Sequence, residues 1–138
     1  MASIKILVVE DDDINREIIH EFLTFGEVNI DLAADGLEAI SWVKSNQYDI
    51  IIMDLMMPNL DGLAATRMIR TLDVNNSAQV PIIASTARDP TTELAHWQAA
   101  GITDYVHKPF SEDELWLLST PIFKLKNGGG CVRLHGSS

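Results

Sequence analysis

The sequence predicts an α/β fold: a doubly wound, five-stranded parallel sheet with helices on both faces. Short runs rich in isoleucine and valine alternate five times with segments whose apolar residues recur at helical spacing. This alternation is typical of parallel sheets, because each helix returns the chain to the starting edge of the next strand. The runs are almost continuously apolar, as expected for strands that are covered on both faces.

The first half of the chain is expected to contain three strands and two helices. The strands fall at Ile4–Val9, Val28–Ala33 and Ile50–Asp54. A helix over 15–25 separates the first two strands, and a second helix follows the turn at Asp35 and Gly36. The first helix would present one apolar face, formed by Ile14, Ile18, Ile19, Phe22 and Leu23.

In the second half, Asp61 is the expected N-cap of a third helix. Strands are expected over 81–85 and 103–107, with a fourth helix over 91–100 between them. Gly101 is a suitable end for that helix, because glycine readily adopts the left-handed conformation of a C-terminal cap.

A fifth helix is expected over 111–118. It opens with Ser111 and Glu114 at the spacing of a capping box, in which each side chain binds the other's backbone N–H. Pro121 disfavours continuation of this helix. We therefore assign 1–120 to one domain and 121–138 to a tail or linker that is partly disordered.

Composition restricts the functions that are compatible with the chain. It has 138 residues, 46% of them hydrophobic, which suits one domain with a sizeable core. Its formal net charge of −10 argues against nucleic-acid or anionic-membrane partners, because both require basic surfaces. There is no secretory-signal pattern and only one cysteine, Cys131, so a cytoplasmic location is expected.

Polar residues follow four of the predicted strands at their carboxyl ends. Glu10 and Asp11 follow the first strand, and Asp54 ends the third; Thr86 and Lys108 follow the fourth and fifth. Ligands of open α/β sheets bind at this edge, so these side chains are expected to converge. Three carboxylates repel one another and require a cation; hard oxygen ligands favour Mg²⁺, with Mn²⁺ as an alternative.

This residue set suits phosphoryl chemistry. Asp54 would be the nucleophile that forms an acyl phosphate, and Glu10 and Asp11 would hold the metal. Lys108 would supply a second positive charge, and the Thr86 hydroxyl would donate to a phosphoryl oxygen. The loop after Asp54 would add backbone groups to the metal and the phosphate.

The candidate site residues lie in four stretches of the sequence: ILVVEDD at 6–12, MDLMMPNLDG at 53–62, PIIASTA at 81–87 and AGITDYVHKPF at 100–110. In this order and spacing they resemble the motifs of response-regulator receiver domains, over roughly residues 4–118. The resemblance implies a flavodoxin-like sheet with strand order 2-1-3-4-5. It also implies a phosphoacceptor function in a two-component system or phosphorelay.

By position, the resemblance identifies Asp54 as the acceptor of a phosphoryl group from a histidine kinase or histidine phosphotransfer protein. Glu10 and Asp11 match the acidic pair, and the backbone carbonyl of Met56 matches a metal ligand. Lys108 matches the lysine of the site. Thr86 and Tyr105 match the switch pair, which would reshape a surface of the fourth helix, fifth strand and fifth helix for a downstream protein partner.

Two other functions remain open on the sequence. The first is a Mg²⁺-dependent phosphatase that uses an aspartyl phosphate; the haloacid-dehalogenase class, however, needs a second Asp where this chain has Met56. The second is a scaffold that keeps the fold without using phosphate. In the receiver interpretation the chain is no conventional enzyme, since it catalyses only its own phosphorylation and dephosphorylation. In some receivers the residue two positions after the phosphoacceptor helps to position the hydrolytic water. The resemblance identifies Met56 with this residue, and because its side chain hydrogen-bonds weakly, it implies a long-lived acyl phosphate.

Overall fold

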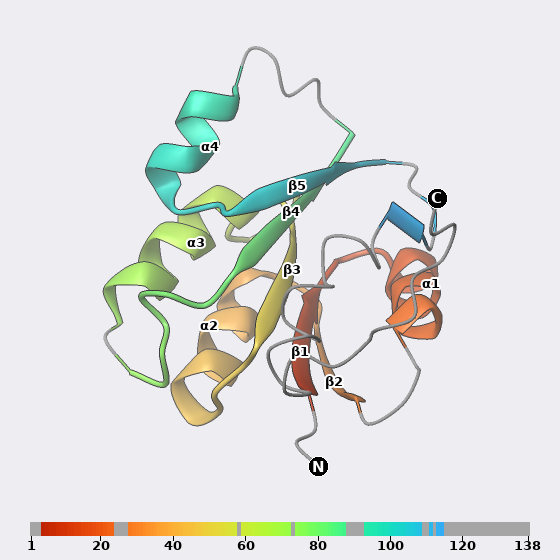
Figure 1. Cartoon of the computed structure of the whole chain (residues 1–138), viewed down its shortest axis with the longest axis horizontal. Helices are drawn as coiled ribbons and strands as arrows, with labels where there is room; N and C mark the ends of the chain where they lie inside the picture. Colours follow the sequence, from red (N-terminus) through yellow and green to blue (C-terminus); the bar gives the residue numbers. More distant parts are fainter. Residues whose placement is uncertain are drawn as a thin grey trace, which may run out of the picture.

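A five-stranded parallel sheet forms the centre of the molecule, with the strand order β2-β1-β3-β4-β5 (Figure 1). The strands are β1 (Ile4–Val9), β2 (Val28–Ala33), β3 (Ile50–Asp54), β4 (Ile82–Thr86) and β5 (Asp104–His107). The structure is a computed structural model, which describes residues 4–23, 28–57, 59–72, 74–87, 93–108, 111, 113 and 114. The predicted fold class and strand order are confirmed.

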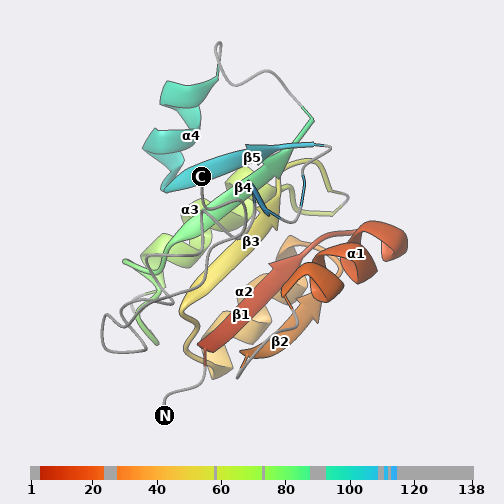
Figure 2. The same ribbon diagram turned by 45° about the vertical axis from the view of Figure 1, so that its right-hand side comes forward.

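Helices cover both faces of this sheet. They are α1 (Asp13–Leu23), α2 (Gly36–Ser45), α3 (Gly62–Thr71) and α4 (Leu94–Ala100). Figures 1 and 2 show α2 and α3 on one side of the sheet and α1 on the other. Among the described helices, none is long and apolar enough to cross a membrane.

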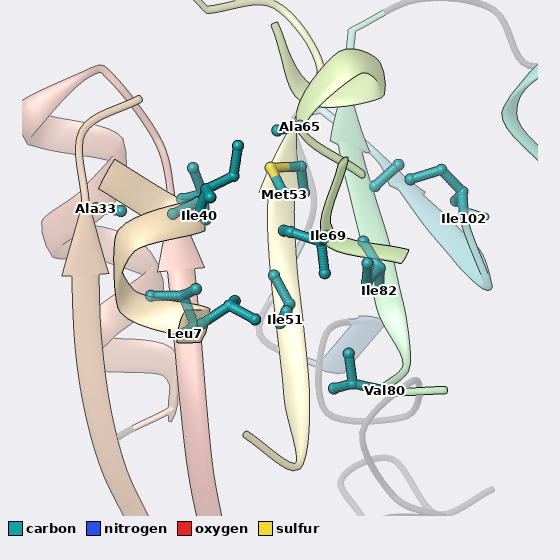
Figure 3. Close-up of a cluster of buried hydrophobic side chains, with 14 of the residues drawn as sticks. Leu7, Ala33, Ile40, Ile51, Met53, Ala65, Ile69, Val80, Ile82 and Ile102 are labelled. Atoms are coloured by element: carbon teal, nitrogen blue, oxygen red, sulfur yellow. The ribbon is translucent and has the colours of Figure 1, made fainter. Parts of the chain in front are cut away.

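Alternate residues of each strand enter two separate apolar clusters, one on each face. Leu7, Ile51 and Met53 pack with Ile40 of α2 and Ile69 of α3 (Figure 3). Their sequence neighbours point the other way and pack toward α1: Ile6, Val8, Ile52 and Ile83 join Ile19. Each fully buried aliphatic side chain stabilises the fold by about 1.5–3 kcal/mol, so the two faces together hold the strands in register.

Capping residues fix several helix ends where the sequence predicted them. The Asp61 carboxylate accepts from the Ala64 N–H at 2.8 Å at the start of α3. Gly101 ends α4 with a φ of 109°, in the left-handed region. Ser111 and Glu114 exchange side-chain-to-backbone hydrogen bonds of 2.8 and 3.2 Å, which is the expected capping box.

The first helix differs from its prediction in two ways. It begins at Asp13 rather than residue 15, because the Asp12 carboxylate accepts from the backbone N–H groups of Ile14 and Asn15. Its apolar face is only partly buried: Ile19 is buried, whereas Ile14 is 71% exposed and Ile18 is 42% exposed. The helical periodicity predicted the helix, but it did not predict which of the apolar residues on that face are buried.

Other boundaries shift by a few residues. β4 runs over Ile82–Thr86 and β5 over Asp104–His107, one residue later than expected at their starts. α4 begins at Leu94, and positions 91 and 92 of its predicted span lie outside the described residues. Most of the predicted fifth helix over 111–118, and all of the predicted tail over 121–138, also lie outside them. The domain boundary at 120 stays a prediction.

Candidate functional site

The sheet topology brings the ends of four strands to one edge. β1 pairs with β3, β3 with β4, and β4 with β5, all in parallel. Glu10 and Asp11 follow β1, Asp54 is the last residue of β3, and Lys108 follows β5. Residues that are up to 98 positions apart in the chain therefore meet in one site.

Three carboxylates form the acidic part of this site. Oxygen atoms of Glu10, Asp11 and Asp54 all lie within 4.8 Å of one another. Glu10 and Asp54 are buried, at 1% and 3% exposure, whereas Asp11 faces solvent. Burial and the negative charge of Glu10 raise the pKa of Asp54 to about 7. In the folded protein, burial and the neighbouring charge therefore make the ionised form of Asp54 less favourable than it is in water.

Lys108 partly relieves this repulsion. Its Nζ lies 3.1 Å from Glu10 Oε1 and 3.4 Å from Asp54 Oδ1. Burial by itself would lower the pKa of Lys108, but the charges of Asp54 and Glu10 outweigh that effect and raise it. The ammonium group thus stays charged and lies directly against the carboxylate proposed as the nucleophile.

The donor set fits a hard divalent cation. It consists of three carboxylates, and one lysine provides too little positive charge to neutralise all three. The exposed Asp11 leaves one side open to water, which suits an ion that keeps part of its hydration shell. On donor chemistry the residues fit Mg²⁺ or Mn²⁺ better than a soft metal.

The loop that follows β3 also contacts the Asp54 carboxylate. The backbone N–H of Met56 donates to Asp54 Oδ1 at 3.1 Å, while the Met56 side chain is 56% exposed. This hydrogen bond lowers the pKa of Asp54, against the larger effects of burial and Glu10. The predicted metal contact of the Met56 carbonyl stays a prediction.

The predicted switch residues lie on the same face of the sheet as the larger apolar cluster. Thr86 is fully buried at the end of β4, and its carbonyl accepts from the Lys108 N–H at 2.7 Å. Tyr105 of β5 is half-buried and packs against that cluster, opposite Ala84 in the strand register. Thr86 and Tyr105 therefore lie on the two paired strands, β4 and β5, whose ends position Lys108.

Two residues that sequence reasoning did not select also shape the site. The Asp12 N–H donates to Glu10 Oε2 at 3.3 Å, and its carboxylate caps α1. Arg16 donates from Nη1 to the Glu10 carbonyl at 3.0 Å and forms an ion pair with Asp13. Asp12 carried a recognisable N-cap signal, whereas a contact between a side chain and a carbonyl six residues earlier leaves no sequence pattern.

Comparison with known proteins agrees with this geometry. The family model "Response regulator receiver domain" matches residues 6–118. The response regulator MprA of Mycobacterium bovis (strain BCG / Pasteur 1173P2) is 40% identical over 113 residues, which cover 82% of this chain and 47% of MprA. This chain therefore spans about half the length of the curated relatives that it matches.

Solved structures match over nearly the whole chain. The receiver domain of sensor histidine kinase PA1611 from Pseudomonas aeruginosa PAO1 is 37% identical, with a TM-score of 0.76 and coverage of 92% of this chain and 99% of that one. That receiver has a magnesium ion coordinated in its active site cleft. The receiver domain of Francisella response regulator 1452 is 32% identical, with a TM-score of 0.79 and coverage of 89% and 98%. By sequence and by structure, the chain belongs to the response regulator receiver domain family.

Proposed function

We propose that Asp54 is the residue through which this receiver accepts its phosphoryl group. The observation that carries the proposal is the convergence of Asp54 with Glu10, Asp11 and Lys108 at the carboxyl edge of the sheet. An oxygen of the Asp54 carboxylate bonds to phosphorus while the bond from phosphorus to the donor's imidazole nitrogen breaks. The imidazole keeps the electron pair of that bond.

Glu10, Asp11 and Asp54 would hold Mg²⁺, with the Met56 carbonyl as a further ligand; Mn²⁺ fits the same oxygen atoms. The PA1611 receiver, which has magnesium in its cleft, supports this assignment. When bound, the ion supplies positive charge that offsets the charge of the phosphoryl oxygens. Burial and the charge of Glu10 raise the pKa of Asp54, and the repulsion between the two carboxylates favours uptake of a cation, since a cation stabilises the ionised carboxylate.

Lys108 would stabilise the phosphoryl group from the side of β5, because its Nζ already contacts Asp54. The Thr86 hydroxyl would then donate to a phosphoryl oxygen and move toward Asp54. The Tyr105 ring would enter the space that this movement opens. Such a change shifts an existing equilibrium between two conformations and alters the surface of α4 and β5.

Membership in the family implies a histidine kinase as partner, and a histidine phosphotransfer protein would serve equally as donor. The downstream protein would bind α4, β5 and the predicted fifth helix. We place the protein in the cytoplasm, where such donors act, and expect neither nucleic-acid nor membrane binding by this segment. The predicted assignment of 1–120 to the receiver and 121–138 to a tail belongs to the same proposal.

The test is to incubate the protein with acetyl phosphate and Mg²⁺ and to measure its intact mass. We expect one added phosphoryl group in wild type and none in Asp54→Asn. Asp104→Asn is the matched control, since Asp104 is exposed at the opposite end of β5 and should not affect labelling. Labelling that persists in Asp54→Asn would reject Asp54 as acceptor. Repeated release of phosphate from added phosphate esters would instead support the phosphatase, and absence of labelling would support the scaffold.

A further inference from the structure

A hydrogen bond joins the loop after β3 to the turn before α2. Asn59 Nδ2 donates to Asp35 Oδ2 at 2.8 Å, across 24 positions of sequence. The other oxygen of Asp35 accepts from the Glu38 N–H at 2.9 Å and so caps α2. The Asp35 carboxylate therefore contacts both the N-terminus of α2 and Asn59 in the loop after β3.

Backbone packing around two glycines shows how closely the loop is held. A Cβ on Gly36 would lie 2.5 Å from the Leu60 carbonyl oxygen, so the turn and the loop are in direct backbone contact. A Cβ on Gly62 would lie 2.2 Å from the Asp54 carbonyl oxygen. No other residue fits at either position without movement of the backbone, since real Cβ atoms do not approach so closely.

The same loop carries the backbone contact to the acceptor. Its base is closed by a hydrogen bond of 3.3 Å from the Gly62 N–H to the Leu55 carbonyl. The Met56 N–H, next to this base, donates to Asp54 Oδ1. Asn59 is only three residues further and has a φ of 65°, a left-handed conformation that its side-chain contact helps to hold.

We infer that Asp35 and Asn59 are positioning residues for the phosphoacceptor site. Their hydrogen bond restrains Asn59. Asn59 in turn restrains the loop that holds the Met56 N–H against Asp54. An exposed hydrogen bond contributes little to overall stability, so its main effect is on where the loop lies. The part of this inference that concerns the bound ion rests on the function proposed above.

Two variants break the contact without disturbing its surroundings. Asp35→Ser keeps a good N-cap for α2 but loses the second oxygen, and Asn59→Gly keeps access to the left-handed conformation. Glu38→Ala is the matched control: Glu38 accepts from the Ala34 N–H, so its loss weakens the start of α2 without touching Asn59.

The first measurement is amide hydrogen exchange at Met56 without any metal. We expect faster exchange in Asp35→Ser and Asn59→Gly, no further increase in the double variant, and the wild-type rate in Glu38→Ala. Equal exchange at Met56 in wild type and both single variants would overturn the inference, whether or not the protein takes up phosphate.

The second measurement is the Kd for Mg²⁺ by calorimetric titration, together with Tm. We expect each single variant to weaken Mg²⁺ binding by about 3- to 10-fold, with a double variant no weaker than either single one. A purely structural role would lower Tm in the variants and leave the Kd for Mg²⁺ unchanged. Failure of wild type itself to bind Mg²⁺ would reject the proposed function and leave the exchange result to decide the positioning role.

Discussion

Trp97 of α4 and Tyr105 of β5 form an edge-to-face pair, with ring centroids 6.0 Å apart and ring planes at 62°. Trp97 is fully buried, and its Nε1 has no hydrogen-bond partner in the described part of the chain. Aromatic pairs in this geometry contribute about 0.5–1.5 kcal/mol beyond the area that they bury. Rotation of Tyr105 would remove this contact, so the position of α4 is coupled to the proposed switch.

Trp97 fluorescence should therefore report phosphorylation. In a protein with Trp42→Phe and Trp116→Phe, Trp97 is the remaining tryptophan. We expect acetyl phosphate with Mg²⁺ to change its emission, because the Tyr105 ring leaves its edge. Adding Tyr105→Ala should abolish the response while Asp54 still takes up phosphate, as intact mass would show. If Tyr105→Ala shows the same change in fluorescence as the protein with Tyr105, the emission of Trp97 does not report on Tyr105.

The raised pKa of Asp54 predicts a pH-dependent stability. Its pKa rises from 3.8 to about 7 on folding, so the folded state binds the proton more tightly than the unfolded state between these values. The resulting stabilisation is fully present below about pH 4 and is lost as pH rises through about 7. Asp54→Asn, which is neutral throughout, should be more stable than wild type by about 2–4 kcal/mol at pH 8.5, and by less at pH 5.5.

Urea unfolding of both proteins at the two pH values measures this difference. Asp104→Asn is again the control, because Asp104 is exposed and lies at the opposite end of β5 from the site. Added Mg²⁺ should stabilise wild type more than Asp54→Asn at the higher pH, since the ion favours the ionised carboxylate. If the difference in stability between wild type and Asp54→Asn is the same at both pH values, the raised pKa of Asp54 is contradicted.

The exposed side chain of Met56 predicts a long-lived acyl phosphate. Its thioether cannot orient an attacking water as an amide can, because methionine sulfur is a weak hydrogen-bond acceptor and no donor. We expect the phosphoryl group to be lost faster from Met56→Asn than from wild type, because an amide can hydrogen-bond to the attacking water. Met68→Asn is the matched control, because Met68 is also exposed but lies on α3. Decay in wild type as fast as in Met56→Asn would reject the prediction.

Arg70 at the end of α3 should be important for stability. It donates to the Gly101 carbonyl at 3.1 and 2.6 Å, to Ser77 at 3.2 Å and to Val80 at 2.6 Å. Burial lowers the pKa of its guanidinium, but arginine stays charged at any working pH.

Arg70→Ala would leave these half-buried carbonyls without their donor, so we expect a loss of about 2–3 kcal/mol in the free energy of unfolding. Arg70→Lys should recover part of it, because an ammonium group cannot reach all of the carbonyls at once. Arg67→Ala, on the exposed side of α3, should change stability by no more than about 0.5 kcal/mol, and urea unfolding checks all three. Equal losses for the variants at positions 67 and 70 would contradict a specific role of Arg70.

The sequence predicted the sheet and the convergence at its edge because these depend on local patterns. Apolar runs such as Ile50–Asp54 identify strands, and parallel pairing then places Glu10 and Asp54 at the same edge. The exposure of Ile14 and Ile18 was not predictable, since it depends on what else covers α1. The contacts of Arg70 and Asn59 were equally inaccessible, because their partners lie 7 to 31 positions away and are backbone carbonyls or a single carboxylate.

The ion pair of Glu10 with Lys108 has a consequence for biosynthesis. The two residues lie 98 positions apart in the chain, one directly after β1 and the other directly after β5. The pocket is therefore complete only after β5 and Lys108 have been translated. A nascent chain that ends before β5 has Asp54 without the ammonium group of Lys108 beside it.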